Sequence, residues 1–339
     1  MRAETEREET AYGFSWCLTD GQHYVRAPDG DVRAVNGQTV ELLRLFATEE
    51  LTREALCRQR DGGEAVLDES SAVDPETVID LFDRYREDGF LREGEPVVRL
   101  HPPAEVRLWP RLLATLLAVA ALVAVAVARA PAFRALAADP PSLWLVAALF
   151  PATLPFVAVH ELGHYATASR HFDSSIRIDT VNGVVPAVVT DTTGAWLLPR
   201  NRRVWINVAG PLAESLTALP VAAAVAVGAG GTAALLVLAA VLSDVVFALN
   251  PFFHGDGYWI ASDLLGVENV RSRGLDAVRR RELTWPAVYV VVSYAVGAAF
   301  VLQVVVVTVL VEGVRGVVYA APVVLLAALA WADVDLRTA

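Results

Sequence analysis

The segment LWLVAALFPATLPFVAVHELGH, residues 143–164, places an uncharged apolar run directly before the motif His160-Glu161-Leu162-Gly163-His164. A membrane-spanning helix needs about 20 apolar residues, so this run predicts a span that ends at the motif. Residues four apart share one face of a helix, and His160 and His164 can therefore bind one zinc ion together, with Glu161 as a general base. A chance match is the alternative, but ionisable groups at membrane depth are costly and usually functional.

Further apolar runs lie on both sides of this segment. The mean hydropathy of +0.43 is higher than soluble domains reach, and long apolar runs explain it. The sequence therefore predicts an α-helical polytopic membrane protein with about six transmembrane helices. The runs cover residues 112–128, 140–159, 204–229, 232–249, 283–311 and 316–332.

The arginines predict the orientation of these spans, because cytoplasmic loops of membrane proteins carry an excess of basic residues. With a cytoplasmic amino terminus, cytoplasmic loops hold ten arginines and outside loops hold three. Residues 1–16 contain no apolar stretch of the secretory type, which agrees with this arrangement. We therefore expect both termini in the cytoplasm, with random scatter of arginine as the alternative.

Residues 1–100 differ from the rest in charge, with 23 acids against 12 arginines, whereas residues 101–339 hold 16 of each. An acidic chain with no basic stripe is a poor nucleic-acid binder. Cys17 and Cys57 are the only cysteines, which excludes a disulfide framework and a cysteine-based zinc cluster.

The pattern of residues 1–100 predicts a small soluble domain. Alternation around Pro28-Asp29-Gly30 predicts a hairpin at 22–36, and leucines at helical spacing predict one or two helices at 37–60. Asp74 predicts the start of a helix that reaches residue 88, and Phe90-Leu91 is expected to form a last strand. We therefore expect an α+β winged-helix-like cytoplasmic domain at 1–100 and a membrane domain at 101–339.

The predicted zinc site needs a third protein ligand, because a catalytic zinc has three and keeps one position open. The stretch Asn250–Trp259, NPFFHGDGYW, follows the fourth run and would lie on the same side of the membrane as His164. Asp256 and His254 are both possible ligands. The alternatives are a helix-end carboxylate for Asp256 and an interfacial histidine for His254.

HELGH and NPFFHGDGYW together resemble the motifs of the site-2 protease family of intramembrane zinc metalloproteases, and especially its bacterial peptide zinc metalloprotease branch. The resemblance covers about residues 140–265. It implies a zinc endopeptidase in a bacterial cytoplasmic membrane, with Asp256 as the third ligand. It also implies that Asn250 holds the substrate or the oxyanion.

Two more features bear on this resemblance. Residues 207–212, NVAGPL, are similar to the family's Gly-Pro segment. Gly255 and Glu214 depart from the family pattern, where a bulky apolar residue and an asparagine are usual, but neither change removes a ligand. Glu214 and Asp244 are acids within predicted spans, and they either line a polar path or are buried and hydrogen-bonded.

The pattern of residues 20–95 resembles the recognition element of ribosomally made peptide natural products, which holds a leader peptide as an added strand. This implies that the substrate is a precursor peptide and that its leader is removed. A simple accessory domain is the alternative for this region. For the whole chain, the alternatives are regulated cleavage of a membrane-spanning signalling substrate and a non-enzymatic metal transporter or binder, although transporters place their ligands near the bilayer midplane.

A second hairpin is predicted between the two metal-binding motifs. Residues 171–200 alternate around Asn182-Gly183, a dipeptide typical of tight turns. An exposed edge of this hairpin could receive an extended substrate. A re-entrant or interfacial loop is the alternative.

Overall fold

The computed structural model describes residues 5–63, 66, 74–139, 141–181, 185–253, 255–267 and 269–312. The chain forms two compact units. Unit 1 comprises Met1–Val106, His171–Asp173 and Thr192–Arg202, and unit 2 comprises Arg107–Arg170, Ser174–Asp191 and Arg203–Ala339. Two short segments from the middle of the chain thus belong with the amino-terminal residues, which no pattern in the sequence indicated.

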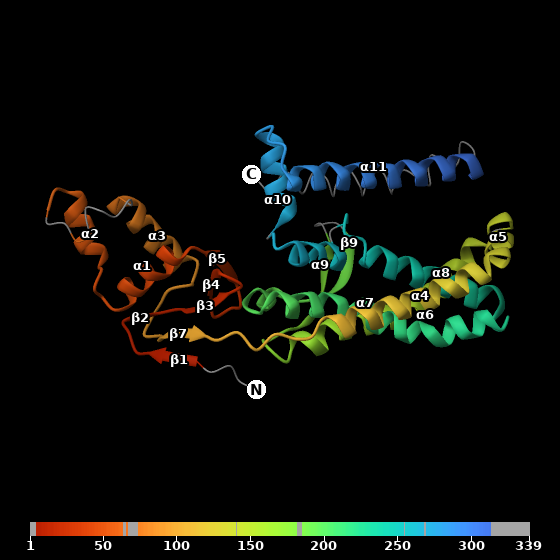
Figure 1. The fold of residues 1–339 in the computed structure, drawn as a ribbon, viewed down its shortest axis with the longest axis horizontal. Helices are drawn as coiled ribbons and strands as arrows, with labels where there is room; N and C mark the ends of the chain where they lie inside the picture. Colours follow the sequence, from red (N-terminus) through yellow and green to blue (C-terminus); the bar gives the residue numbers. More distant parts are fainter. Residues whose placement is uncertain are drawn as a thin grey trace. The chain divides into compact units, whose positions relative to one another are not determined.

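Unit 1 contains a five-stranded sheet with the strand order β1-β7-β3-β4-β5 (Figure 1). The hairpin predicted around Pro28-Asp29-Gly30 is confirmed, because β4 and β5 pair antiparallel on either side of it. A separate pair joins β2 to β6. The strands are β1 (Thr5–Glu8), β2 (Tyr12–Gly13), β3 (Ser15–Thr19), β4 (Gln22–Arg26), β5 (Val32–Val35), β6 (Arg92–Glu93) and β7 (Val97–Leu100).

The strand expected at Phe90-Leu91 is wrong. Gly89 adopts a φ of 75°, which reverses the chain after the preceding helix. The backbone N–H groups of Phe90 and Leu91 then both donate to the carbonyl of Tyr85, so neither is available to a sheet. Both side chains are buried in the core instead, and the strand begins at the next residue.

Three helices pack on one another and on the sheet in unit 1: α1 (Gly37–Ala47), α2 (Arg53–Arg60) and α3 (Pro75–Glu87). Each has a side-chain cap, and the predicted cap at Asp74 is confirmed, since its carboxylate accepts the Thr77 N–H at 2.9 Å. Phe46 and Phe82 lie with ring centroids 4.4 Å apart at the centre of the core. The largest fully buried side chains around them include Leu43, Leu56, Val78 and Leu91.

A short 3-10 helix from the middle of the chain, η1 (Thr193–Leu197), completes unit 1. The Thr19 hydroxyl donates to the carbonyl of Leu197 at 3.2 Å. Trp196 stacks on Tyr24 with centroids 6.4 Å apart, and the Leu197 side chain is buried against Cys17 and Tyr24. Apolar surface of the sheet is therefore covered by residues distant in the sequence.

Unit 2 is helical apart from one hairpin. A core of small and branched side chains lies between α4, α6, α7 and α8, with Leu122, Phe156, Ala218 and Leu238 among its members. The helices are α4 (Trp109–Ala128), α5 (Ala130–Ala138), α6 (Leu143–Ala168), α7 (Arg200–Ala226), α8 (Gly231–Ala248), α9 (Asp256–Leu265), α10 (Val270–Arg279) and α11 (Trp285–Glu312).

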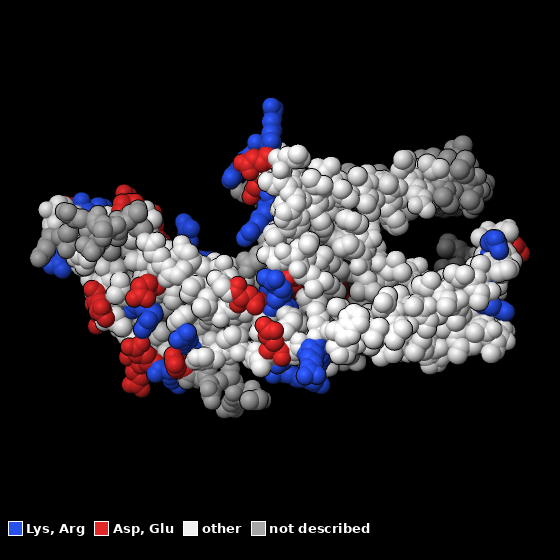
Figure 2. Space-filling view, viewed as in Figure 1, with Lys and Arg blue, Asp and Glu red and all other residues white. Residues whose placement is uncertain are grey.

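Four helices of the described residues are long and apolar enough to cross a membrane, which indicates a membrane protein. On the face seen in Figure 2, the sides of the long helices carry almost no charged atoms. The count of about six is not confirmed. Residues 143–159 of the run at 140–159 lie in α6, which is not among the four, and the run at 316–332 lies outside the described residues. The four are Trp109–Ala128, Arg200–Ala226, Gly231–Ala248 and Trp285–Gln303. The orientation of the termini stays a prediction.

The hairpin predicted between the two metal-binding motifs is confirmed. Strands β8 (Ile176–Val181) and β9 (Val185–Thr190) pair antiparallel, from Val181 opposite Val185 to Ile176 opposite Thr190. The Asn182-Gly183 turn itself lies outside the described residues. The hairpin packs on α6 through β9, which brings the end of β9 to the metal-binding motif.

Candidate metal centre

The site begins with the close approach of α6 and α7. A Cβ added at Gly163 on α6 would collide with the backbone of Ala209 and Gly210 on α7. A Cβ added at Gly210 would in turn collide with the rings of His164 and His160. Small residues allow helix backbones to pack this closely in a membrane. The two glycines therefore let α7 cover the two histidines directly.

His160, His164 and Asp256 converge on one point. His160 Nε2 lies 3.0 Å from His164 Nε2 and 3.0 Å from Asp256 Oδ2, and His164 Nε2 lies 3.3 Å from the same oxygen. Both histidines are buried. Tetrahedral zinc ligands at 2.0–2.1 Å from the ion lie about 3.3 Å apart, so these separations fit three ligands of one ion.

The hydrogen bonds on the far sides of the rings decide where the imidazole protons lie. His164 Nδ1 lies 2.8 Å from the carbonyl oxygen of Ile206, which can only accept, so this nitrogen carries the proton. His160 Nδ1 donates in the same way to Glu214 Oε2 at 2.8 Å. In the neutral rings both Nε2 atoms therefore present lone pairs to each other and to Asp256 Oδ2. Three electron donors with no proton among them repel unless a cation lies between them.

The carboxylate of Asp256 is held in its ionised form. Burial alone would raise the pKa of this carboxyl, but positive charge beside it, on the imidazoles of His164 and His160 when they are protonated or on an ion bound in place of those protons, lowers the pKa below its usual range. Ligating carboxylates are deprotonated. This donor set of two neutral imidazoles and one carboxylate is the kind that catalytic zinc uses. The chemistry of these residues therefore fits the zinc ion predicted from the sequence.

Asp256 is the first residue of α9, and the turn between α8 and α9 aims it at the histidines. A Cβ at Gly257 would collide with the backbone of Leu249 and Asn250, so only glycine lets α9 begin this close to the end of α8. The Tyr289 hydroxyl donates to the carbonyl of Pro251 and fixes the turn to α11. The chain is therefore not helical at Pro251, since α8 ends at Ala248 and α9 begins at Asp256.

A buried ion pair also fixes α9 to α7. Arg203 Nε donates to Asp263 Oδ1 at 2.7 Å, and both side chains are less than a tenth exposed. Such a charge-assisted bond has a well-defined geometry. Arg203 lies on α7, which also carries Ile206, the acceptor for His164. Asp263 lies on α9, which begins with the ligand Asp256. The ion pair therefore helps to set the spacing of α7 and α9.

The carboxylate of Glu161 is held by the β8–β9 hairpin. Thr190 Oγ1 donates to Glu161 Oε2 at 2.7 Å and also lies 3.0 Å from the carbonyl oxygen of Glu161. Thr190 is the last residue of β9. The hairpin therefore orients the side chain that the motif designates as a base.

The two other predicted residues have different outcomes. Asn250 Oδ1 accepts the Phe252 N–H at 2.9 Å and so closes the turn that follows α8, while its catalytic role stays a prediction. His254 lies outside the described residues. Asp256, the other possible ligand, lies with the two histidines.

The sequence left Glu214 open between a polar path and a buried, hydrogen-bonded acid, and it did not indicate the contact of Thr190 with Glu161. Glu214 is fully buried on α7, and its contact with the far nitrogen of His160 makes a carboxylate–histidine pair of the type that orients metal ligands. A glutamate in a predicted span was the only signal in the sequence. Its partner could not be read from the sequence because it lies 54 residues away on another helix.

Comparison with known proteins adds no family. No family model matches the chain, and neither a curated protein nor a solved structure matches it. The resemblance to site-2 proteases therefore depends on the sequence motifs.

Proposed function

We propose that this chain is a membrane-embedded zinc endopeptidase of the site-2 protease type that cleaves a peptide bond at the cytoplasmic side of the bilayer. The observation that carries the proposal is the convergence of His160 Nε2, His164 Nε2 and Asp256 Oδ2, three proton-free donors within 3.3 Å of one another. The second supporting observation is the glutamate of the same motif, which a hairpin holds beside them.

Each residue of the site has a role in this proposal. A zinc ion held by His160, His164 and Asp256 would supply Lewis-acid activation of the scissile carbonyl and of a water molecule. Glu161 would accept the proton of the attacking water and pass it to the leaving amine. Thr190 would keep the Glu161 carboxylate in position through its 2.7 Å hydrogen bond. Asn250 would hold the substrate or the developing oxyanion, as the resemblance implies.

The proposal is tested by separating metal binding from cleavage. Full-length wild type and Glu161→Gln are purified, reconstituted in lipid vesicles and given a quenched fluorescent peptide library. We expect wild type and variant to hold about one zinc ion each, and only wild type to cleave. Glu282→Gln, at an exposed glutamate outside the site, is the matched control and is expected to cleave normally. Near-wild-type turnover by Glu161→Gln, or a wild type that binds no zinc, would contradict the proposal.

We further propose that the substrate is a precursor peptide whose leader docks on unit 1. The supporting observation is that β1 and β5 form the two edges of its sheet, where an extended peptide can add as a strand. Binding of a labelled leader peptide is measured on full-length Glu161→Gln, because Thr192–Arg202 complete this unit and residues 1–100 lack them. Absence of binding for any leader encoded beside the gene would leave unit 1 as an accessory domain.

A further inference from the structure

A large cavity lies between α6, α7 and α8, on the side of His160 that faces away from the three converging donors. Its volume is about 810 Å³, within the range of small-molecule sites. Apolar side chains form most of its wall, among them Leu149, Phe156, Leu236 and Val241. The proposed zinc site does not use this space.

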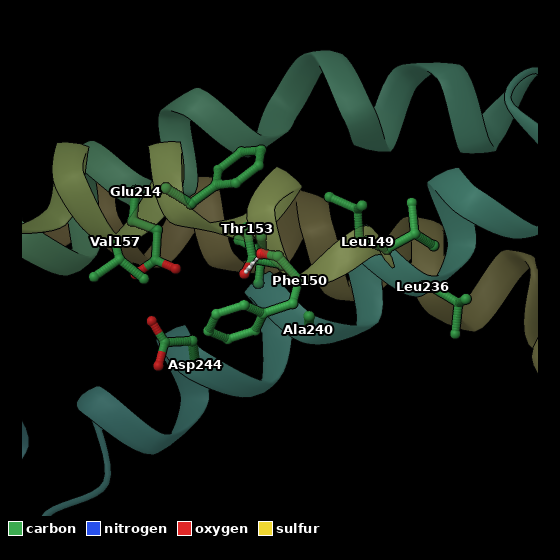
Figure 3. Close-up of a pocket in the computed structure, with 11 residues that line it drawn as sticks. Leu149, Phe150, Thr153, Val157, Glu214, Leu236, Ala240 and Asp244 are labelled. Carbon is green, nitrogen blue, oxygen red and sulfur yellow. Dashed lines mark hydrogen bonds between the residues drawn. The ribbon is translucent and has the colours of Figure 1, made fainter. Parts of the chain in front are cut away.

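One end of the cavity is acidic. Figure 3 shows the carboxylates of Glu214 and Asp244 turned toward each other there, with Leu149 and Leu236 at the opposite end. Ligand atoms of Glu214, Asp244 and His160 all lie within 4.8 Å of one another. Among the described residues that line the cavity, none has a basic side chain. Glu214 is buried and Asp244 is exposed, and His160 is the ring that already contacts Glu214.

Glu214 has one oxygen left for a ligand. Its Oε2 accepts a hydrogen bond from His160 Nδ1. Among the described residues its Oε1 has no hydrogen-bond partner, although the side chain is only 1% exposed. A buried carboxylate oxygen without a donor is costly. A donor that enters the cavity would remove this cost.

We propose that this cavity binds an amphiphilic amine, a molecule with a compact apolar body and one ammonium group held between Glu214 and Asp244. The ammonium would donate to the free Oε1 and pair with the Asp244 carboxylate, while the apolar body would fill the space toward Leu149. An uncharged lipid chain would fill the apolar part but would leave the acidic end unpaired. This inference is independent of the proposed peptidase activity.

A second metal ion is the competing occupant of the acidic end. Its third ligand would have to be His160 Nδ1, which carries a proton and donates a hydrogen bond to Glu214. A metal ion would also leave the apolar space unfilled. The geometry therefore favours an organic cation over an inorganic one.

The test uses two probes with the same apolar body, the cation 1-adamantylamine and the neutral 1-adamantanol. Equilibrium dialysis against the zinc-loaded full-length chain in detergent measures their affinities. We expect one equivalent of the amine to bind at least tenfold more tightly than the alcohol. Asp244→Asn, which keeps the shape of the side chain, is expected to weaken the amine at least tenfold and to leave the alcohol within twofold. Asp276→Asn, at an exposed acid on α10, is the matched control and is expected to change neither.

Retained binding of the alcohol by Asp244→Asn shows that the cavity has survived the substitution. Ala240→Phe, which places a ring in the cavity, is expected to remove binding of both probes. The proposal is overturned if the amine does not bind, if amine and alcohol bind equally, or if Asp244→Asn binds the amine as wild type does. It is also overturned if a second equivalent of zinc binds in competition with the amine and is lost in Asp244→Asn. None of these measurements depends on peptide cleavage.

Discussion

Replacing Gly210 by alanine is expected to empty the metal centre without changing a ligand. A Cβ at this position would lie 2.7 Å from His164 Cε1 and 2.8 Å from His160 Cδ2. Because non-bonded heavy atoms pack at about 3.5 Å, the His160 ring must retreat by about 0.7 Å, and the His164 ring, whose Nε2 would lie 2.3 Å from the added Cβ, by about 1.2 Å. Zinc ligands tolerate displacements of only about 0.2 Å. We therefore expect the zinc affinity to fall at least about 100-fold, equivalent to about 2.7 kcal/mol.

The assay is zinc content by elemental mass spectrometry, together with affinity from competition with a chromophoric chelator. Gly297→Ala is the matched control, because Gly297 also lies inside an apolar helix and the nearest atom to an added Cβ is 4.0 Å away. Alanine is favoured over glycine inside helices, so neither substitution is expected to unfold its helix. If Gly210→Ala keeps one zinc ion at wild-type affinity, the arrangement of α7 over the two histidines is wrong.

Three further predictions concern the surroundings of the site and unit 1. Glu214→Gln is expected to lower zinc affinity about 10–100-fold, since the carboxylate that orients a ligand is lost; an unchanged affinity in the chelator assay would argue against that role. Asp263→Asn removes the negative charge that pairs with the buried Arg203 at 2.7 Å, and it is expected to cost about 3–5 kcal/mol, measured as a lower thermal midpoint in detergent. Replacing both Asp263 and Arg203, by Leu and Met, is expected to recover most of this loss. Burial raises the pKa of the Cys17 thiol, against a smaller opposite effect of its hydrogen bond. The stability of unit 1 is therefore expected to fall as the pH rises above about 8.5, where the unfolded thiol ionises. Iodoacetamide at that pH is expected to modify Cys57 well before Cys17, and equal rates by mass spectrometry would contradict the burial of Cys17.

Local features of the fold could be predicted because their causes are local. The cap at Asp74 depends on residues three apart, and the hairpin at residues 22–36 depends on a turn and on alternation. The pairing of His160 with His164 follows from the period of a helix. These predictions needed no knowledge of any other part of the chain.

Long-range features could not be predicted, because they depend on which helices meet. The hydrogen bond between Glu214 and His160 requires α7 to cross α6 where Gly163 and Gly210 permit it. The residue pattern of one helix does not indicate which helix it will contact or where. The strand expected at Phe90-Leu91 failed for a related reason. Its backbone donors are taken by a carbonyl of the preceding helix, so side-chain character alone was misleading.

The membership of Thr192–Arg202 in unit 1 limits how this architecture can be inherited and recombined. A gene fusion that exchanged only the first hundred codons would place a foreign sheet against the old Trp196 and Leu197. Those two side chains match Tyr24 and Cys17 in shape, so a mismatch would leave an apolar seam exposed to water. The amino-terminal region and the segments from the middle of the chain are therefore expected to change together in evolution, because three separate stretches of the gene encode one folded unit.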